Sequence, residues 1–190
     1  SWRQDSAKRM RAQFDRAKLS PEAQVNFDIW ALEADRAALS HANRMQRPPF
    51  YSRLYSVHSQ MPDFLVNTHS VADLADLDNY IARLRGIPAV LDVAIARSMA
   101  SEAAGVHPPK FQIETVINGS EKLTSGAPFG PGPDAALWAD VKAKTVALVK
   151  SGKLAQSEAD TRLAQAREAI LALKPAYDRV VAWAKRRLNS

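Results

Sequence analysis

Apolar residues recur every three or four positions along most of this chain, which places them on one face of an α-helix. The clearest run covers residues 73–104, and its apolar positions are Leu74, Leu77, Ile81, Leu84, Leu91 and Ile95. Glycine is scarce, at 7 of 190 residues, while alanine and leucine are common, and this composition favours helix over strand. The sequence therefore predicts an all-α fold.

Prolines and capping residues indicate where these helices begin and end. Ser20, Pro21 and Glu22 form a strong helix start, with an N-cap hydroxyl, a proline at the first helical position and an acid in the first turn. A proline within a helix removes one hydrogen bond and costs about 3 kcal/mol, so we expect a kink or a break near residues 85–88 and a bend near Pro175. The expected helices cover residues 6–18, 21–44, 73–104, 108–123, 134–152 and 157–187.

Residues 49–69 interrupt this pattern, because their apolar and aromatic residues lack the helical spacing. We expect one long irregular, aromatic-rich segment here, with room for a short strand pair. Tyr51, Tyr55 and His58 each combine an apolar body with a polar tip, so they are candidates for the lining of a substrate cleft. The alternative is a segment that packs over the helices and has no binding role.

The chain as a whole has the composition of an ordinary globular protein, with 46% hydrophobic and 24% charged residues. This is enough to bury one sizeable core, and no repeat at a fixed period is visible. We therefore predict a single helical domain over residues 1–190, arranged as an antiparallel bundle with kinked helices. No run of about 18 apolar residues occurs, so we expect no membrane span.

The chemistry-bearing residues are too scattered to predict a catalytic or metal site. The four histidines are His41, His58, His69 and His107, with separations of 17, 11 and 38 positions. A helical zinc site needs two histidines four positions apart, so none of these is predicted to bind metal. The chain has no cysteine and no Gly-x-Ser-x-Gly motif, and its glycine-rich loop is interleaved with prolines that lack the donors a phosphate needs. We predict no catalytic and no metal residue.

The net charge of +6 raises the possibility of a nucleic-acid partner. Acidic residues interrupt the basic ones, however, and no recognised nucleic-acid motif is present, so no nucleic-acid binding is expected. The absence of cysteine suits a bacterial cytoplasm and, if a signal peptide was removed, a periplasm equally.

Several short stretches of the sequence, taken together and in order, resemble those of a known family. Residues 79–88 read Asn-Tyr-Ile-Ala-Arg-Leu-Arg-Gly-Ile-Pro, and residues 104–109 read Ala-Gly-Val-His-Pro-Pro. These phrases resemble the bacterial family called domain of unknown function 885, whose members carry YIARLRALP and AGITPPR. Residues 19–28, 54–65, 127–129 and 174–177 are similar to further phrases of that family, in the same order.

The resemblance implies a mostly helical protein, longer than this chain, with a zincin-like metallopeptidase core. The family's zinc motif resembles HExxPGHH and lies downstream of the part matched here, so no catalytic or metal residue is carried over. We therefore expect a fragment of a longer protein: the non-catalytic N-terminal helical region of a zinc-dependent peptidase-like bacterial protein, which walls a substrate cleft. The stretch 54–65 is the part expected to face that cleft.

The same resemblance sets the expected partners and cofactor. The partners are the remainder of the chain's own polypeptide and a peptide substrate. No cofactor is expected in this chain, and zinc is implied for the complete family member. The alternative function is a stand-alone helical protein-interaction module without enzymatic activity.

Overall fold

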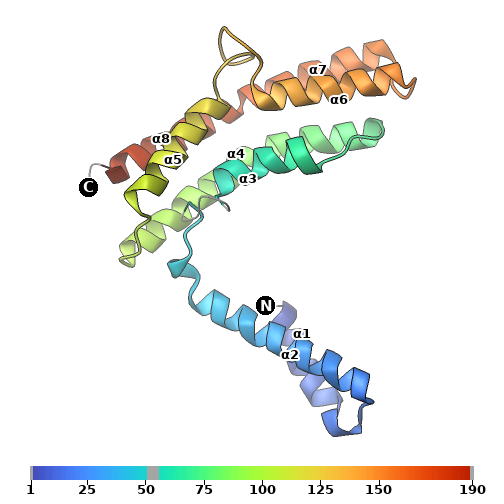
Figure 1. Cartoon of the computed structure of the whole chain (residues 1–190), viewed down its shortest axis with the longest axis vertical. Helices are drawn as coiled ribbons and strands as arrows, with labels where there is room; N and C mark the ends of the chain where they lie inside the picture. The colour runs from blue at the N-terminus through green and yellow to red at the C-terminus, as the bar shows by residue number, and fades with distance from the viewer. Residues whose placement is uncertain (1, 51–55, 189–190) are drawn as a thin grey trace. The chain divides into compact units, whose positions relative to one another are not determined.

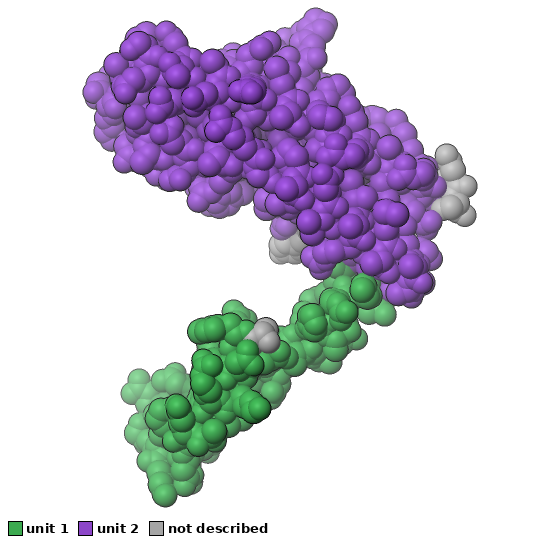
Figure 2. Space-filling view, turned by 180° about the vertical axis from the view of Figure 1, so that it is seen from behind, with its two compact units in different colours: residues 1–47 green, residues 48–190 purple. Residues whose placement is uncertain are grey.

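The computed structural model describes residues 2–50 and 56–188 (Figure 1). Its regular elements are all helical, and the described residues form no strand beyond an isolated bridge between Ala127 and Asp134. The prediction of an all-α fold is confirmed. The chain divides into two compact units, residues 1–47 and residues 48–190, which are distinguished by colour in Figure 2. Each unit is described below by itself, so the single domain expected over residues 1–190 stays a prediction.

Unit 1 is built from two packed helices, α1 (Trp2–Gln13) and α2 (Pro21–Ala42). The predicted start of α2 is confirmed, because the hydroxyl of Ser20 accepts a hydrogen bond from the amide of Ala23 at 3.3 Å. The rings of Trp2 and Trp30 meet edge to face, with centroids 5.7 Å apart. Short 3-10 turns follow each helix, at Arg16–Lys18 and Arg44–Gln46.

The apolar face of α2 is exposed, contrary to what its helical spacing suggests. The side chains of this row are between 50% and 65% exposed, and its members are Val25, Ile29, Leu32 and Leu39. At 100° per residue, this row lies on the side of α2 opposite Trp30 and Ala34. Because α1 packs on the Trp30 side, as the ring contact shows, the apolar row is left uncovered.

Unit 2 contains the hydrophobic core. Helix α8 packs against both α4 and α5, while α7 packs against α4 and α6 (Figure 1). Fully buried side chains from these helices meet in one cluster, which includes Leu77, Tyr80, Leu84, Leu91, Val116, Val141, Ile170, Tyr177, Val180 and Trp183. The helices of this unit are α3 (Val57–Asp63), the π-helix η3 (Phe64–Thr68), α4 (Leu74–Ala103), α5 (Lys110–Leu123), α6 (Ala136–Lys150), α7 (Gln156–Leu171) and α8 (Leu173–Leu188).

The segment expected to be irregular is partly helical. Residues 57–68 form α3 and η3, and the strand pair allowed for this segment is not formed among the described residues. The spacing of the apolar residues did not indicate a helix here for two reasons. The α-helix α3 is only seven residues long and contains Pro62, and the change to π geometry after Asp63 shifts the period at which side chains share a face. The buried side chains of residues 57–68 are His58, Pro62 and Leu65, and Leu65 belongs to the core cluster.

The two interior prolines lie in different positions within their helices. Helix α4 continues through Pro88 without a break, because Leu84, Ile87 and Leu91 around it are buried and their packing outweighs one lost hydrogen bond. The single helix expected over residues 157–187 is two helices, since α7 ends at Leu171. Pro175 then lies in the first turn of α8, where a missing backbone donor costs little.

Candidate functional site

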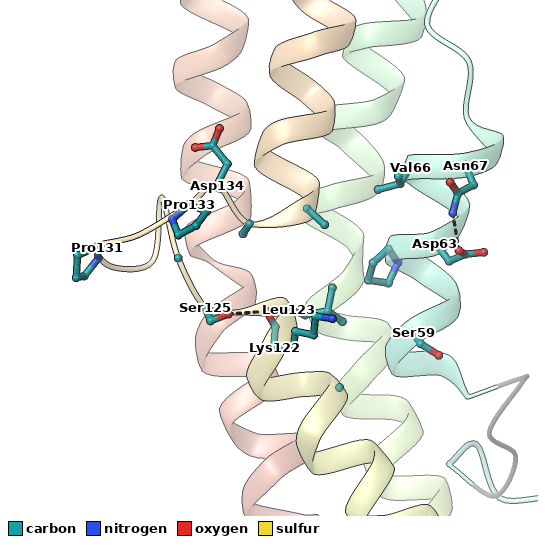
Figure 3. Close-up of a pocket in the computed structure, with 15 residues that line it drawn as sticks. Ser59, Asp63, Val66, Asn67, Lys122, Leu123, Ser125, Pro131, Pro133 and Asp134 are labelled. Atoms are coloured by element: carbon teal, nitrogen blue, oxygen red, sulfur yellow. Dashed lines mark hydrogen bonds between the residues drawn. The ribbon is translucent and has the colours of Figure 1, made fainter.

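A groove of about 850 Å³ opens in unit 2 between two stretches of the chain, residues 59–67 and 119–136 (Figure 3). One wall is formed by α3 and η3, and the other by the end of α5, the loop after it and the start of α6. Most of its lining is apolar, and the polar exceptions come from serine, asparagine, aspartate and lysine side chains. The lining residues are Ser59, Pro62, Asp63, Val66, Asn67, Gly119, Lys122, Leu123, Ser125, Gly126, Pro131, Pro133, Asp134, Ala135 and Ala136.

The first wall is an apolar surface with a polar rim. Val66 points from η3 into the space between the two walls, while Asp63 and Asn67 lie at the outer edge of their helix (Figure 3). The amide Nδ2 of Asn67 donates a hydrogen bond to Oδ1 of Asp63 at 2.6 Å. The groove therefore offers an apolar contact inside and hydrogen-bonding groups at its edge.

The second wall depends on a loop that closes on itself. The amide of Ala127 donates to the carbonyl oxygen of Pro133 at 2.9 Å, and the amide of Ala135 donates to the carbonyl of Ala127 at 2.7 Å. Gly126 has φ +78°, and a Cβ added there would lie 2.1 Å from the carbonyl oxygen of Pro133. Only glycine fits this position, so the loop geometry has a local sequence cause.

A partly buried hydrogen-bond network holds the π-helix that carries Val66. The ammonium of Lys144 on α6 donates to the carbonyl oxygen of Leu65 at 2.7 Å and to Asp140 Oδ2 at 2.8 Å. The hydroxyl of Tyr80 on α4 donates to the same Asp140 oxygen at 2.8 Å. Burial and the neighbouring Asp140 raise the pKa of Tyr80 well above its usual range, so its hydroxyl keeps the proton that it donates.

The charges in the groove are unevenly neutralised. Asp134 forms an ion pair with Lys142 at 2.5 Å, and the carboxylate of Asp63 accepts from Asn67. The ammonium of Lys122 has no hydrogen-bond or ion-pair partner among the described residues, although it lines the groove.

Of the three predicted cleft residues, His58 is described, and it lies behind the groove instead of in its lining. It is 3% exposed, and its Nδ1 shares a hydrogen bond of 2.7 Å with the hydroxyl of Ser56. A Cβ added to Gly119, a lining residue, would meet Nε2 of His58 at 3.0 Å. Burial lowers the pKa of His58 to about 4, so the ring is neutral at pH 7. Tyr51 and Tyr55 lie outside the described residues.

The other histidines lie in separate surroundings. His69, which belongs to unit 2, is buried. Its Nε2 lies 3.1 Å from the carbonyl oxygen of Asp76, and its Nδ1 contacts Arg83. Nδ1 of His107 lies 3.0 Å from Nη2 of Arg187, and His41 belongs to α2 of unit 1. Within the described ranges, no three His, Asp or Glu side chains are grouped so that they could hold a metal ion.

Most residues that line the groove were not predicted from the sequence, and the exception is one stretch of the chain. Ser59, Pro62 and Asp63 belong to the stretch 54–65 that the resemblance indicated as facing a cleft. Val66 and Lys122 carried no local signal, because a groove forms only where segments about 60 positions apart meet. The Gly- and Pro-rich composition of residues 125–133 did indicate a loop, and loops often contribute to binding sites.

Comparison with known proteins finds one family. A family model described as a bacterial protein of unknown function, DUF885, matches residues 1–190. No curated protein and no solved structure gives a match. Among the described residues, no helix combines the length and the apolarity that crossing a bilayer requires.

Proposed function

Because this chain belongs to the DUF885 family of bacterial proteins of unknown function, we propose that it is a non-catalytic helical region that walls a peptide-binding cleft. The observation that carries the proposal is the groove of about 850 Å³ in unit 2. Its volume falls within the range of ligand sites, and its mostly apolar lining with a few polar groups is typical of them. Part of one wall, from Ser59 to Asp63, belongs to the stretch 54–65 that the family resemblance indicates as facing a cleft.

A peptide is the ligand class that suits this lining best. Val66 and Leu123 provide apolar contacts from opposite walls, which fit side chains of an extended segment. Ser59, Asn67 and Ser125 provide hydroxyl and amide groups that can bond to peptide carbonyls and amides. Among the described lining residues there is no histidine, and the groups present are suited to binding a peptide.

The zinc-peptidase activity of the complete protein is the finer part of the proposal, and it is supported by the sequence resemblance alone. In this proposal, the zinc ligands and the general base come from a different part of the polypeptide. The residues described here then contribute the binding of substrate beside that centre. The partners proposed are the remainder of the polypeptide and the peptide substrate.

The test is peptide binding with a pair of matched variants. A set of fluorescently labelled, capped octapeptides is titrated into the purified chain, and anisotropy reports the dissociation constant. Val66→Asp places a charge on the apolar wall and should weaken binding by about tenfold or more. Val146→Asp, on an exposed position of α6 outside the groove, should leave binding unchanged. Equal affinity for both variants, or no binding by the unmodified chain at millimolar peptide, would overturn the proposal.

A second candidate, a stand-alone helical interaction module, is favoured by the exposed row on α2. Val25, Ile29 and Leu32 present apolar side chains at helical spacing, as helices that bind in grooves do. The two candidates differ in which substitution matters. Replacing Ile29 and Leu32 by serine should abolish partner binding by a module, while leaving peptide binding in the groove intact.

A further inference from the structure

We infer that the groove selects peptides that carry a carboxylate next to an apolar side chain, and that Lys122 binds this carboxylate. The inference rests on the proposed function, because it names the class of peptide that the same groove would take. It adds a specificity-determining residue that the family match does not assign.

The first step of the argument is the charge balance of the groove. Its lining contains two carboxylates and one ammonium, from Asp63, Asp134 and Lys122. Asp134 is neutralised by Lys142 at 2.5 Å, and Asp63 accepts a hydrogen bond of 2.6 Å from Asn67. Lys122 alone among the described lining charges has no partner within the described part of the chain. The groove therefore has a cation available to a ligand, and an anionic ligand group complements it.

The second step is the position of this cation. Lys122 is in the last turn of α5 and is followed directly by Leu123, which also lines the groove (Figure 3). Val66 lies on the facing wall and points into the same space. A ligand that occupies the groove would meet apolar surface and an ammonium side by side, so its own apolar and anionic groups should be adjacent.

The third step concerns the source of the carboxylate. An aspartate or glutamate side chain and a free peptide C-terminus offer the same anionic oxygen atoms to an ammonium. Both are therefore within the class named here. The experiment separates them by placing each on an otherwise identical peptide.

The experiment compares four labelled hexapeptides at low ionic strength. Three are capped at both ends and contain Leu-Glu, Leu-Gln or Leu-Lys at the same position, and the fourth is the Leu-Gln peptide with a free C-terminal carboxylate. The Leu-Glu peptide, the free-carboxylate peptide or both should bind about fivefold more tightly than the capped Leu-Gln peptide. The Leu-Lys peptide should bind least tightly, and added salt should reduce the differences.

Variants of two lysines on one helix assign the effect. Lys122→Gln should remove the preference for the carboxylate, so that this variant binds the Leu-Glu and capped Leu-Gln peptides equally, while Lys122→Arg should retain the preference. Lys110→Gln removes an exposed cation from the first turn of the same helix, outside the groove, and should behave as the unmodified chain. Equal binding of the Leu-Glu, Leu-Gln and free-carboxylate peptides, or a preference that survives in Lys122→Gln, overturns the inference and leaves the proposed function standing. If none of the four peptides binds, the proposed function and the inference both fail.

Discussion

The ammonium of Lys144 lies 2.7 Å from the main-chain carbonyl oxygen of Leu65, so a side chain of α6 bonds directly to the π-helix η3. The π-helix is rare and occurs mostly as a single turn. Lys144 also bonds to Asp140, which accepts from Tyr80. The wall that carries Val66 is therefore joined to α4 and α6 through one partly buried network.

Loss of this lysine should weaken the groove wall. Lys144→Met keeps the aliphatic stem but leaves the carbonyl of Leu65 and the carboxylate of Asp140 short of a donor, which should cost about 2 kcal/mol of the free energy of unfolding. Urea unfolding measures the loss, and hydrogen exchange should show faster exchange at the amide of His69, which bonds to the carbonyl of Phe64. Lys150→Met, at an exposed position of the same helix, is the control and should change neither quantity.

The stability of unit 2 should fall in mild acid because of His58. Its pKa in the folded chain is about 4, against 6.5 for the free side chain, because burial disfavours the charged ring. Between these values the unfolded chain takes up a proton that the folded chain does not, so the free energy of unfolding decreases as the pH falls from 6.5 to 4. The contribution approaches about 3 kcal/mol at the lower limit and is absent above pH 7.

Urea unfolding at pH 7 and pH 4.5 measures this acid sensitivity. His58→Gln keeps a polar group beside Ser56 but does not titrate, so the difference between the two pH values should become smaller in this variant. The imidazole NMR signals of His58 should also remain those of a neutral ring at pH 5. A His58 signal that titrates near 6.5 would contradict the prediction.

Two glycines inside helices should respond to alanine in opposite directions. A Cβ at Gly119 of α5 meets Nε2 of His58 at 3.0 Å, and that buried ring is held by Ser56, so Gly119→Ala should destabilise the fold by about 1 kcal/mol. A Cβ at Gly86 of α4 meets no atom within 4 Å, so Gly86→Ala should stabilise it by about 0.5–1 kcal/mol. Thermal unfolding of both variants gives the comparison, and a stabilising Gly119→Ala would show that His58 can move aside.

In the proposed function the zinc ligands come from a different part of the polypeptide, which predicts that this chain does not retain zinc. His58 and His69 are buried in separate surroundings, and His107 lies beside Arg187, so their side chains do not converge on one point. The purified chain should retain well under one equivalent of zinc after dialysis and should show no chelator-sensitive peptide cleavage. Metal analysis by mass spectrometry and a fluorogenic peptide assay provide the readouts. One equivalent of zinc, with cleavage that a chelator abolishes, would place a complete active site in this chain.

Features that depend on near neighbours in the chain could be predicted from the sequence, and features that depend on packing between helices could not. The cap at Ser20 was predicted correctly because the hydroxyl bonds to an amide three residues away, an interaction within one local segment. Whether Pro88 would kink or break its helix could not be decided from the sequence, because the cost of one lost hydrogen bond has to be weighed against burial of Leu84 and Leu91 by other helices. The sequence proposed His58 as a lining residue, but its burial behind Gly119 depends on a contact between α3 and α5.

By itself the sequence determined the helical nature of the chain, the start of α2, the loop at Gly126 and the lack of local metal motifs, since backbone preference and hydrogen bonds between near neighbours govern all of these. Only the tertiary structure decided that the apolar row of α2 is uncovered, that Lys144 supports η3, and that Val66 faces the end of α5 across a groove. Helical spacing shows that a face is apolar, but which element covers that face depends on packing between segments far apart in the chain.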